Sequence, residues 1–193
     1  MYLVKSNFIL RSLYPHRIWR KHTNGEKILY LTFDDGPHET ATPFALEQLK
    51  RFDAKATFFC IGKNVVEHPT IYQQILSEGH STGNHTFNHL NGWKTDTAIY
   101  LENIRAAQKV IVSNLFRPPY GRMRKGQEKI FLQDNPNHQI IMWDILSGDF
   151  DTKISDEKCR DNVLKNAESG SVIVFHDSEK AFDRMKVALP ATL

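Results

Sequence analysis

Residues 28–37 have the sequence ILYLTFDDGP, a short apolar run that ends in two adjacent acids, a glycine and a proline. The run from Ile28 to Phe33 predicts a β-strand, because it is short and rich in β-branched and aromatic side chains. Asp-Gly and Gly-Pro pairs favour turns, so the strand is expected to end there. Asp34 and Asp35 are therefore expected at the carboxyl end of a strand, where parallel α/β proteins build their sites.

Alternating strand and helix patterns follow this segment along the rest of the chain. Further strands are expected at residues 56–61, 80–84, 115–117, 139–143 and 171–175. Helices are expected at residues 43–52, 70–78, 96–113, 125–133, 155–167 and 179–189. Thr42 and Pro43 are typical of a helix N-cap and first helical position, Ser155 of another N-cap, and Gly79 of a helix end. The alternation predicts a mostly parallel sheet covered by helices, either open and doubly wound or closed into a barrel.

The composition is that of an ordinary globular domain. The 193 residues carry a formal net charge of +3 without a dense run of Lys and Arg, which argues against a nucleic-acid-binding protein. Cys60 and Cys159 lie far apart and do not form a disulfide framework. No apolar stretch approaches the ~20 residues of a membrane-spanning helix. No signal peptide is found, so a cytoplasmic location is expected unless a leader has already been removed.

Polar side chains that can do chemistry follow five of the six predicted strands. They are Asp34 and Asp35 after the first strand, His85 and His89 after the third, Arg117 and Tyr120 after the fourth, Asp144 and Asp149 after the fifth, and His176 and Asp177 after the sixth. The carboxyl ends of parallel strands lie on one face of the fold. These segments are therefore expected to form one pocket, although they lie far apart in the sequence.

Two histidines and a nearby carboxylate indicate a metal site. His85 and His89 are four residues apart, which on a helical turn places both imidazoles on one side. Chance is the alternative, since the chain has nine histidines. Adjacent Asp34 and Asp35 leave a strand in different directions, so one can bind a metal while the other faces the bound water. Two histidines and one carboxylate leave coordination positions open, as in catalytic zinc sites.

An aspartyl phosphatase is a rival interpretation of two acids after the first strand. That chemistry needs the two acids to be separated by one residue, so that both reach the same side of the strand. Asp34 and Asp35 are adjacent and do not meet this need. The histidine pair would also have no role in a phosphatase.

Four segments form a recognisable set, namely Thr32-Phe33-Asp34-Asp35-Gly36-Pro37, His85-Thr86-x-x-His89, Arg117-Pro118-Pro119-Tyr120 and Val174-x-His176-Asp177. Together they resemble the polysaccharide deacetylase family, also called the NodB homology domain or carbohydrate esterase family 4. The resemblance spans residues 32–177 and implies a distorted (β/α)7 barrel within the α/β class. We expect residues 1–193 to form one such domain, with residues 1–26 as an N-terminal extension.

The resemblance implies a metal centre with a separate base. The implied metal ligands are Asp35, His85 and His89. Zn²⁺ is the default ion, and Co²⁺, Ni²⁺ and Mn²⁺ suit the same donors. Asp34 is implied as the general base, and Arg117 as the residue that orients it.

The resemblance also implies how the reaction is completed. The backbone N–H of Tyr120 is implied to help hold the oxyanion, and His176 to act as the general acid. Asp149 is implied to pair with His176, although the segment around it departs from the family pattern. Leu146 stands where the family often has Asp, and Phe150 stands where it often has Trp. Two further acids flank this segment and are rival candidates, Asp144 and Asp151.

The implied substrate is an acetylated oligosaccharide or polysaccharide containing N-acetylglucosamine, from which an N-acetyl or O-acetyl group is removed. Tyr120, Trp93, Pro119 and Trp143 are expected to contact the sugar. Two other functions are considered, a carbohydrate-binding protein that has lost turnover and an amidohydrolase of a small non-sugar amide. The sequence leaves the polymer and the oligomeric state open.

Overall fold

The apolar runs of the chain form one parallel sheet in the computed structural model, which describes residues 2–193. The strands run in the spatial order β1-β6-β5-β4-β3-β2-β8-β7, and every neighbouring pair is parallel. Their bounds are β1 Arg17–Ile18, β2 Tyr30–Asp34, β3 Thr57–Cys60, β4 Ser81–Asn84, β5 Leu115–Phe116, β6 Gln139–Ile141, β7 Ile145–Leu146 and β8 Val172–His176. The strand predicted from residues 28–33 is therefore β2, and it lies inside the sheet between β3 and β8.

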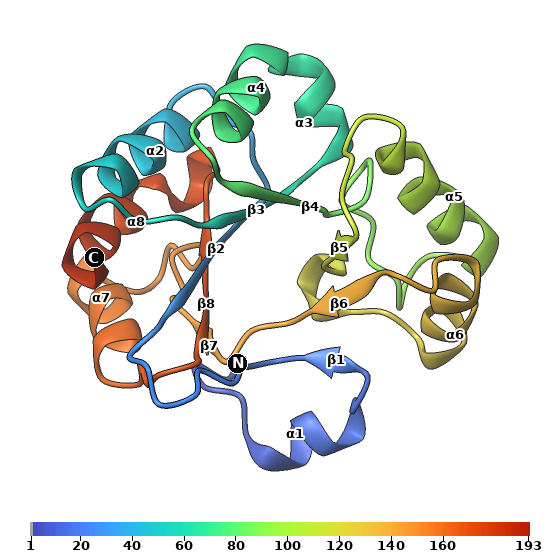
Figure 1. Ribbon diagram of the computed structural model, residues 1–193, viewed down its shortest axis with the longest axis horizontal. Coiled ribbons are helices and arrows are strands. Elements are labelled where there is room, and N and C mark those ends of the chain that lie inside the picture. Colours follow the sequence, from blue (N-terminus) through green and yellow to red (C-terminus); the bar gives the residue numbers. More distant parts are fainter. Residues whose placement is uncertain (1) are drawn as a thin grey trace.

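Helices connect the strands and cover the outside of the sheet (Figure 1). They are α1 Phe8–Leu13, α2 Ala41–Arg51, α3 Gly62–Glu67, α4 Pro69–Ser77, α5 Thr97–Gln108, α6 Lys125–Asp134, α7 Asp156–Leu164, α8 Glu179–Thr192 and the short 3₁₀ helix η1 Pro119–Gly121. None of these helices is long and apolar enough to pass through a membrane.

The sheet curls into a barrel, as Figure 1 shows, so the predicted barrel is confirmed and the open doubly wound sheet is wrong. The chain crosses between the two ends of the curled sheet, because only residues 142–144 separate β7, the strand at one end, from β6, which is next to β1 at the other end. The N-terminal residues also pair near this seam. Ile18 pairs with Ile141 of β6, and Lys5 forms an antiparallel bridge with Ile145 of β7.

The start of α2 differs from its prediction. Thr42 was expected to cap this helix, but the helix begins at Ala41 and Thr42 lies inside it. The Thr42 hydroxyl instead donates to the Asp177 carboxylate at 2.6 Å and accepts from the backbone N–H of His38 at 2.8 Å. The buried Asp177 side chain accepts this hydrogen bond and so takes the hydroxyl away from the capping role.

Other helix ends follow the sequence. The Ser155 side chain accepts from the backbone N–H of Lys158 and caps α7 as predicted. Gly79 follows α4 with a φ of 78°, a conformation that favours glycine. The helix predicted at residues 70–78 is α4, and a separate short helix, α3, precedes it.

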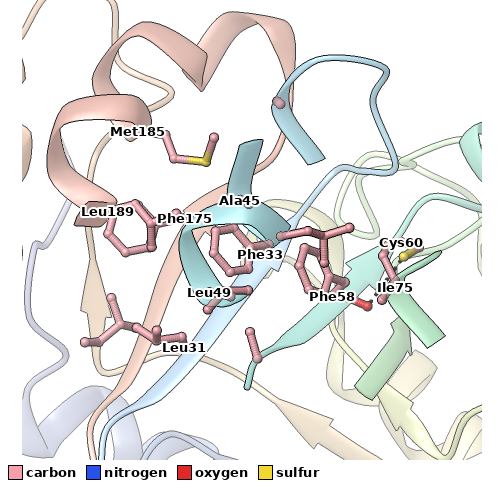
Figure 2. Close-up of a cluster of buried hydrophobic side chains, with 14 of the residues drawn as sticks. Leu31, Phe33, Ala45, Leu49, Phe58, Cys60, Ile75, Phe175, Met185 and Leu189 are labelled. Carbon is pink, nitrogen blue, oxygen red and sulfur yellow. Dashed lines mark hydrogen bonds between the residues drawn. The ribbon is translucent and has the colours of Figure 1, made fainter. Parts of the chain in front are cut away.

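The main hydrophobic core lies between the sheet and helices α2 and α8 (Figure 2). Phe33 of β2 stacks on Phe58 of β3 with ring centroids 4.8 Å apart, and on Phe175 of β8 at 6.0 Å. All three rings are fully buried. Cys60 and Cys159 are buried free thiols, as expected for two cysteines without a disulfide.

We predict that Phe33→Ala destabilises the protein by about 3–5 kcal/mol, because it removes a buried ring between two others and leaves a cavity. Urea denaturation should show this as a lower midpoint with an unchanged slope. The matched control is Phe8→Ala, which removes the same group from a side chain that is 77% exposed. It should change stability by less than about 1 kcal/mol. Equal losses in the two variants would contradict this description of the core.

Candidate active site

A groove of about 730 Å³ lies at the carboxyl ends of the strands. Six of the residues predicted to converge line it, and they lie at the ends of four different strands: Asp34, Asp35, His85, His89, Tyr120 and His176. The parallel sheet brings these six together, as predicted. The other four residues expected in the pocket do not line it: Arg117, Asp144, Asp149 and Asp177. A second cavity of about 520 Å³ lies between α1 and α6 and contains none of these residues.

Three potential metal ligands meet on one side of the groove. Asp35, His85 and His89 each offer one ligand atom, and the three atoms lie within 4.8 Å of one another. Asp35 Oδ1 is 3.1 Å from His89 Nε2 and 3.7 Å from His85 Nε2. Asp35 Oδ1 is also buried and makes no well-oriented hydrogen bond to any residue from 2 to 193. A buried carboxylate oxygen without a partner, close to two imidazole nitrogens, fits a shared cation.

The surroundings of His85 favour the neutral imidazole, the form that can bind a metal. Its Nδ1 lies 2.7 Å from the backbone oxygen of Arg117, and a carbonyl only accepts, so Nδ1 carries the proton. This leaves the lone pair of Nε2 facing Asp35. Burial lowers the pKa of His85 to about 4, against the opposing effect of nearby Asp34, so the ring is uncharged at neutral pH.

The segment between the two histidines is a loop and not the expected helical turn. Thr86 and His89 have φ values of 64° and 55°, and no helix covers them. The Asn103 side-chain oxygen accepts from the backbone N–H groups of Phe87 and Asn88, which folds the loop over α5. The imidazole centroids of the pair are still only 5.1 Å apart. The convergence of the histidines is therefore right, but the reason given by helical spacing is wrong.

The turn that carries Asp35 is held from two sides. Asp35 has a φ of 83°, and its backbone oxygen accepts from Asn64 Nδ2 at 2.7 Å. The next N–H, of Gly36, donates to Asp177 Oδ1 at 3.0 Å. A side chain at Gly36 would collide with the Asp177 carboxylate, so only glycine fits there. Burial raises the pKa of Asp177 to about 8, against its hydrogen bond from Thr42.

Asp34 is fixed by a buried arginine. Asp34 Oδ1 accepts from Arg117 Nη1 at 2.6 Å, while Asp34 Oδ2 lies 3.9 Å from His85 Nε2. The Arg117 side chain is fully buried and uses its other donors on Thr32 Oγ1 and on the backbone oxygens of Ile141 and Met142. Asp34 therefore has one oxygen tied to Arg117 and the other turned toward the metal-ligand set.

His176 and Asp149 form a second charged pair. His176 Nδ1 is 2.7 Å from Asp149 Oδ1, and the His176 backbone N–H donates to Asp149 Oδ2, also at 2.7 Å. Burial lowers the pKa of His176, but the Asp149 carboxylate outweighs this and raises it to about 9. The rival acids lie elsewhere. Asp144 accepts from Ser6 and Ser171, and Asp151 is half-buried and does not line the groove.

Several supporting residues have no signal in the sequence. Arg184 Nε of α8 donates to the Asp149 backbone oxygen at 2.6 Å and secures the loop behind His176. Asn64 supports Asp35 from α3. Tyr2 lines the groove and packs on Phe150, with ring centroids 5.2 Å apart. These residues lie outside the motifs, and only the folded chain brings them to the site.

The four expected sugar contacts fall into two groups. Tyr120 and Trp143 line the groove, and Gly121 leaves room for the Trp143 ring beside η1. Pro119 is buried in η1 and Trp93 stacks on the guanidinium of Arg122, and neither residue lines the groove. Their contact with a substrate stays a prediction.

The fold is an α/β barrel, and three residues in its groove could hold a cation. The family model described as polysaccharide deacetylase matches residues 21–133, and the chain belongs to this family of hydrolases of acetylated carbohydrates. A peptidoglycan-N-acetylglucosamine deacetylase of Bacillus cereus is 36% identical over 160 residues, which cover 80% of this chain and 74% of that protein. A chitooligosaccharide deacetylase of Azorhizobium caulinodans is 33% identical over 162 residues, covering 80% of this chain and 76% of that protein.

Solved structures agree with this family. A crystal structure of a peptidoglycan N-acetylglucosamine deacetylase superposes with a TM-score of 0.82 at 29% identity, covering 97% of this chain and 90% of that chain. Some other curated relatives are much longer, and the chain spans 55% and 38% of the length of two of them.

We predict that Arg117→Lys lowers the free energy of unfolding by about 2 kcal/mol or more. Lysine cannot reproduce the planar fork, so buried oxygens on three segments lose their donors. Urea denaturation measures the loss. Arg51→Lys, at an exposed position, is the matched control and should change stability by less than about 0.5 kcal/mol. A neutral Arg117→Lys variant would show that the guanidinium network does not stabilise the fold.

Proposed function

We propose that the groove is the active site of a metal-dependent deacetylase that removes acetyl groups from the amino sugars of a polysaccharide. The observation that carries the proposal is the placement of three metal-type ligands in one groove with the Asp34 carboxylate and the His176 imidazole. Relatives that act on peptidoglycan or chitin oligomers support a carbohydrate substrate. The reaction is hydrolysis of an acetamide, which needs an activated water and a protonated leaving amine.

Asp35, His85 and His89 would hold the metal. Neutral imidazole nitrogens with one carboxylate favour Zn²⁺ and also suit Co²⁺, Ni²⁺ and Mn²⁺. When bound, such a cation lowers the pKa of water and polarises the acetyl carbonyl. His85 is held in the right tautomer by the Arg117 carbonyl, and Asn64 holds the turn that presents Asp35.

Asp34 would act as the general base. Its Oδ2 faces the ligand set, where it can take the proton of the attacking water, while Arg117 keeps the carboxylate oriented. The backbone N–H of Tyr120 would stabilise the negative charge that develops on the acetyl oxygen. Tyr120 and Trp143 offer aromatic surface to the sugar.

His176 would protonate the leaving amine. Its pKa of about 9 keeps it charged at neutral pH, and its ring lines the groove opposite the histidine ligands. Asp149 holds the ring through Nδ1, which leaves Nε2 for the substrate. Amide hydrolysis needs a base for the attacking water and an acid for the leaving amine, and Asp34 and His176 would take these two roles.

The other two functions give different results in the same assay. Zinc-loaded protein is incubated with N-acetylated chito-oligosaccharides, peptidoglycan strands and small acetamides, and acetate is measured. Acetate from a sugar supports the proposal. Sugar binding without acetate release would support a binding protein, and release from small amides alone would support an amidohydrolase of non-sugar substrates.

We predict that Asp34→Asn keeps its metal but loses at least about 100-fold in kcat, because it removes the base without removing a ligand. His85→Ala should lose both metal and activity. Metal content by mass spectrometry and acetate release distinguish the two variants. Loss of metal in Asp34→Asn would overturn the separation of base and ligand.

We predict that Asp149→Asn shifts the alkaline limit of activity to lower pH. A group whose pKa is raised stays protonated below that pKa, so the wild-type acid is lost only as the pH rises through about 9. Without the Asp149 charge, burial lowers the pKa of His176, and the limit should fall by about 1–3 pH units. The pH profile of kcat/KM measures this shift. An unchanged alkaline limb would show that His176 is not the acid.

A further inference from the structure

Three cationic side chains line the groove beside the proposed catalytic residues: Lys94, Arg122 and Lys180. All three are exposed, and none lies within 4 Å of a carboxylate of residues 2–193. Lys180 interacts electrostatically with Asp151 at longer range but forms no ion pair with it. The mechanism described above uses none of these cations.

The acids of the groove do not neutralise them. Asp34 and Asp35 are the two carboxylates that line it among the described residues. Asp34 is paired with Arg117, and Asp35 lies between the histidine ligands. His176 is paired with Asp149, so this pair adds no net charge. The groove therefore presents an excess of positive charge to whatever binds there, and clefts concentrate such a field.

The cations lie on both sides of the reacting centre. Lys94 and Arg122 come from the loops after β4 and β5, while Lys180 lies in the first turn of α8 after β8. The spatial order β5-β4-β3-β2-β8 places β2, which carries Asp34, between these two groups. A polymer that crosses the groove would meet positive charge on the units that flank the reacting sugar.

The Arg122 side chain is positioned to bind an anionic group of a substrate. Its guanidinium lies over the Trp93 ring at 5.0 Å, and its backbone N–H donates to the Pro119 oxygen at 3.0 Å. A stacked guanidinium loses less freedom on binding and can contact a carboxylate through two parallel hydrogen bonds. Trp93 thus has a role as the support of Arg122, which accounts for its position outside the groove lining.

We propose that Lys94, Arg122 and Lys180 make the groove selective for acetylated amino-sugar polymers that carry carboxylates on units next to the reacting one. A neutral polymer such as a chitin oligomer gives these cations nothing to pair with. The proposal rests on the proposed function, because it names the substrate class of the same site. It adds three specificity residues that do not take part in the hydrolysis itself.

The test compares one polymer with and without its charge. Peptide-free peptidoglycan strands carry a lactyl carboxylate on every second sugar, and conversion to methylamides removes this charge and leaves the acetamides. With the zinc-loaded protein, kcat/KM for acetate release should be about ten-fold or more higher on the charged strands at low salt. The difference should shrink as salt rises, because salt screens exposed charges. Chitin oligomers should behave like the methylamide strands.

The triple variant Lys94→Gln, Arg122→Gln, Lys180→Gln should lose most of the preference for charged strands. The control for the loss of one positive charge is Lys109→Gln, which lies at the end of α5 and outside the groove. It is compared with the single variant Lys94→Gln, which removes one charge inside the groove. Equal kcat/KM on charged and methylamide strands would overturn the selectivity and leave the deacetylase proposal intact.

A binding measurement separates the two proposals if no substrate is turned over. Dissociation constants of the charged and methylamide strands are measured by calorimetry with the same zinc-loaded protein. Absence of acetate from every substrate would count against the proposed function. Tighter binding of the charged strands would still support selectivity, and equal dissociation constants would overturn it.

Discussion

The buried guanidinium of Arg117 is the interaction on which the site depends. Its side chain bonds to Asp34 and Thr32 of β2 and to two backbone oxygens at the end of β6, while its own backbone oxygen holds His85. One residue therefore fixes a carboxylate, a metal-type ligand and the spacing of three strands. A fully buried charge is costly unless it is paired and hydrogen-bonded, and here each of the three guanidinium nitrogens donates at least one hydrogen bond. The same network thus makes the barrel and the site inseparable.

The sequence predicts much of the fold, and physical reasons explain why. Apolar runs such as residues 28–33 and 171–175 are long enough to show strand character, and their alternation with helices indicates a parallel sheet. The convergence of Asp34, His85 and His176 follows from the rule that carboxyl ends of parallel strands share a face. The choice of a barrel over an open sheet came from the family resemblance, because periodicity does not record curvature.

The remaining features depend on contacts between distant residues. β1 and β7 have two residues each, too few for a pattern, and they form because neighbouring strands offer free backbone groups. The loop between His85 and His89 takes its shape from Asn103, and Thr42 leaves its capping position for Asp177. Asn64 and Arg184 belong to no sequence motif, because each supports the site through a hydrogen bond to a backbone oxygen of a distant residue.

The N-terminal segment supplies β1 at one end of the curled sheet and bridges β7 at the other through Lys5, and it brings Tyr2 into the groove wall beside Phe150. Whatever is attached before Tyr2, whether an affinity tag or a fused domain, begins at the rim of the substrate groove. The choice of terminus for a tag is therefore a choice about access to the catalytic centre. The C-terminus follows α8 on the outside of the barrel, and it is the better place for immobilisation or labelling (Figure 1).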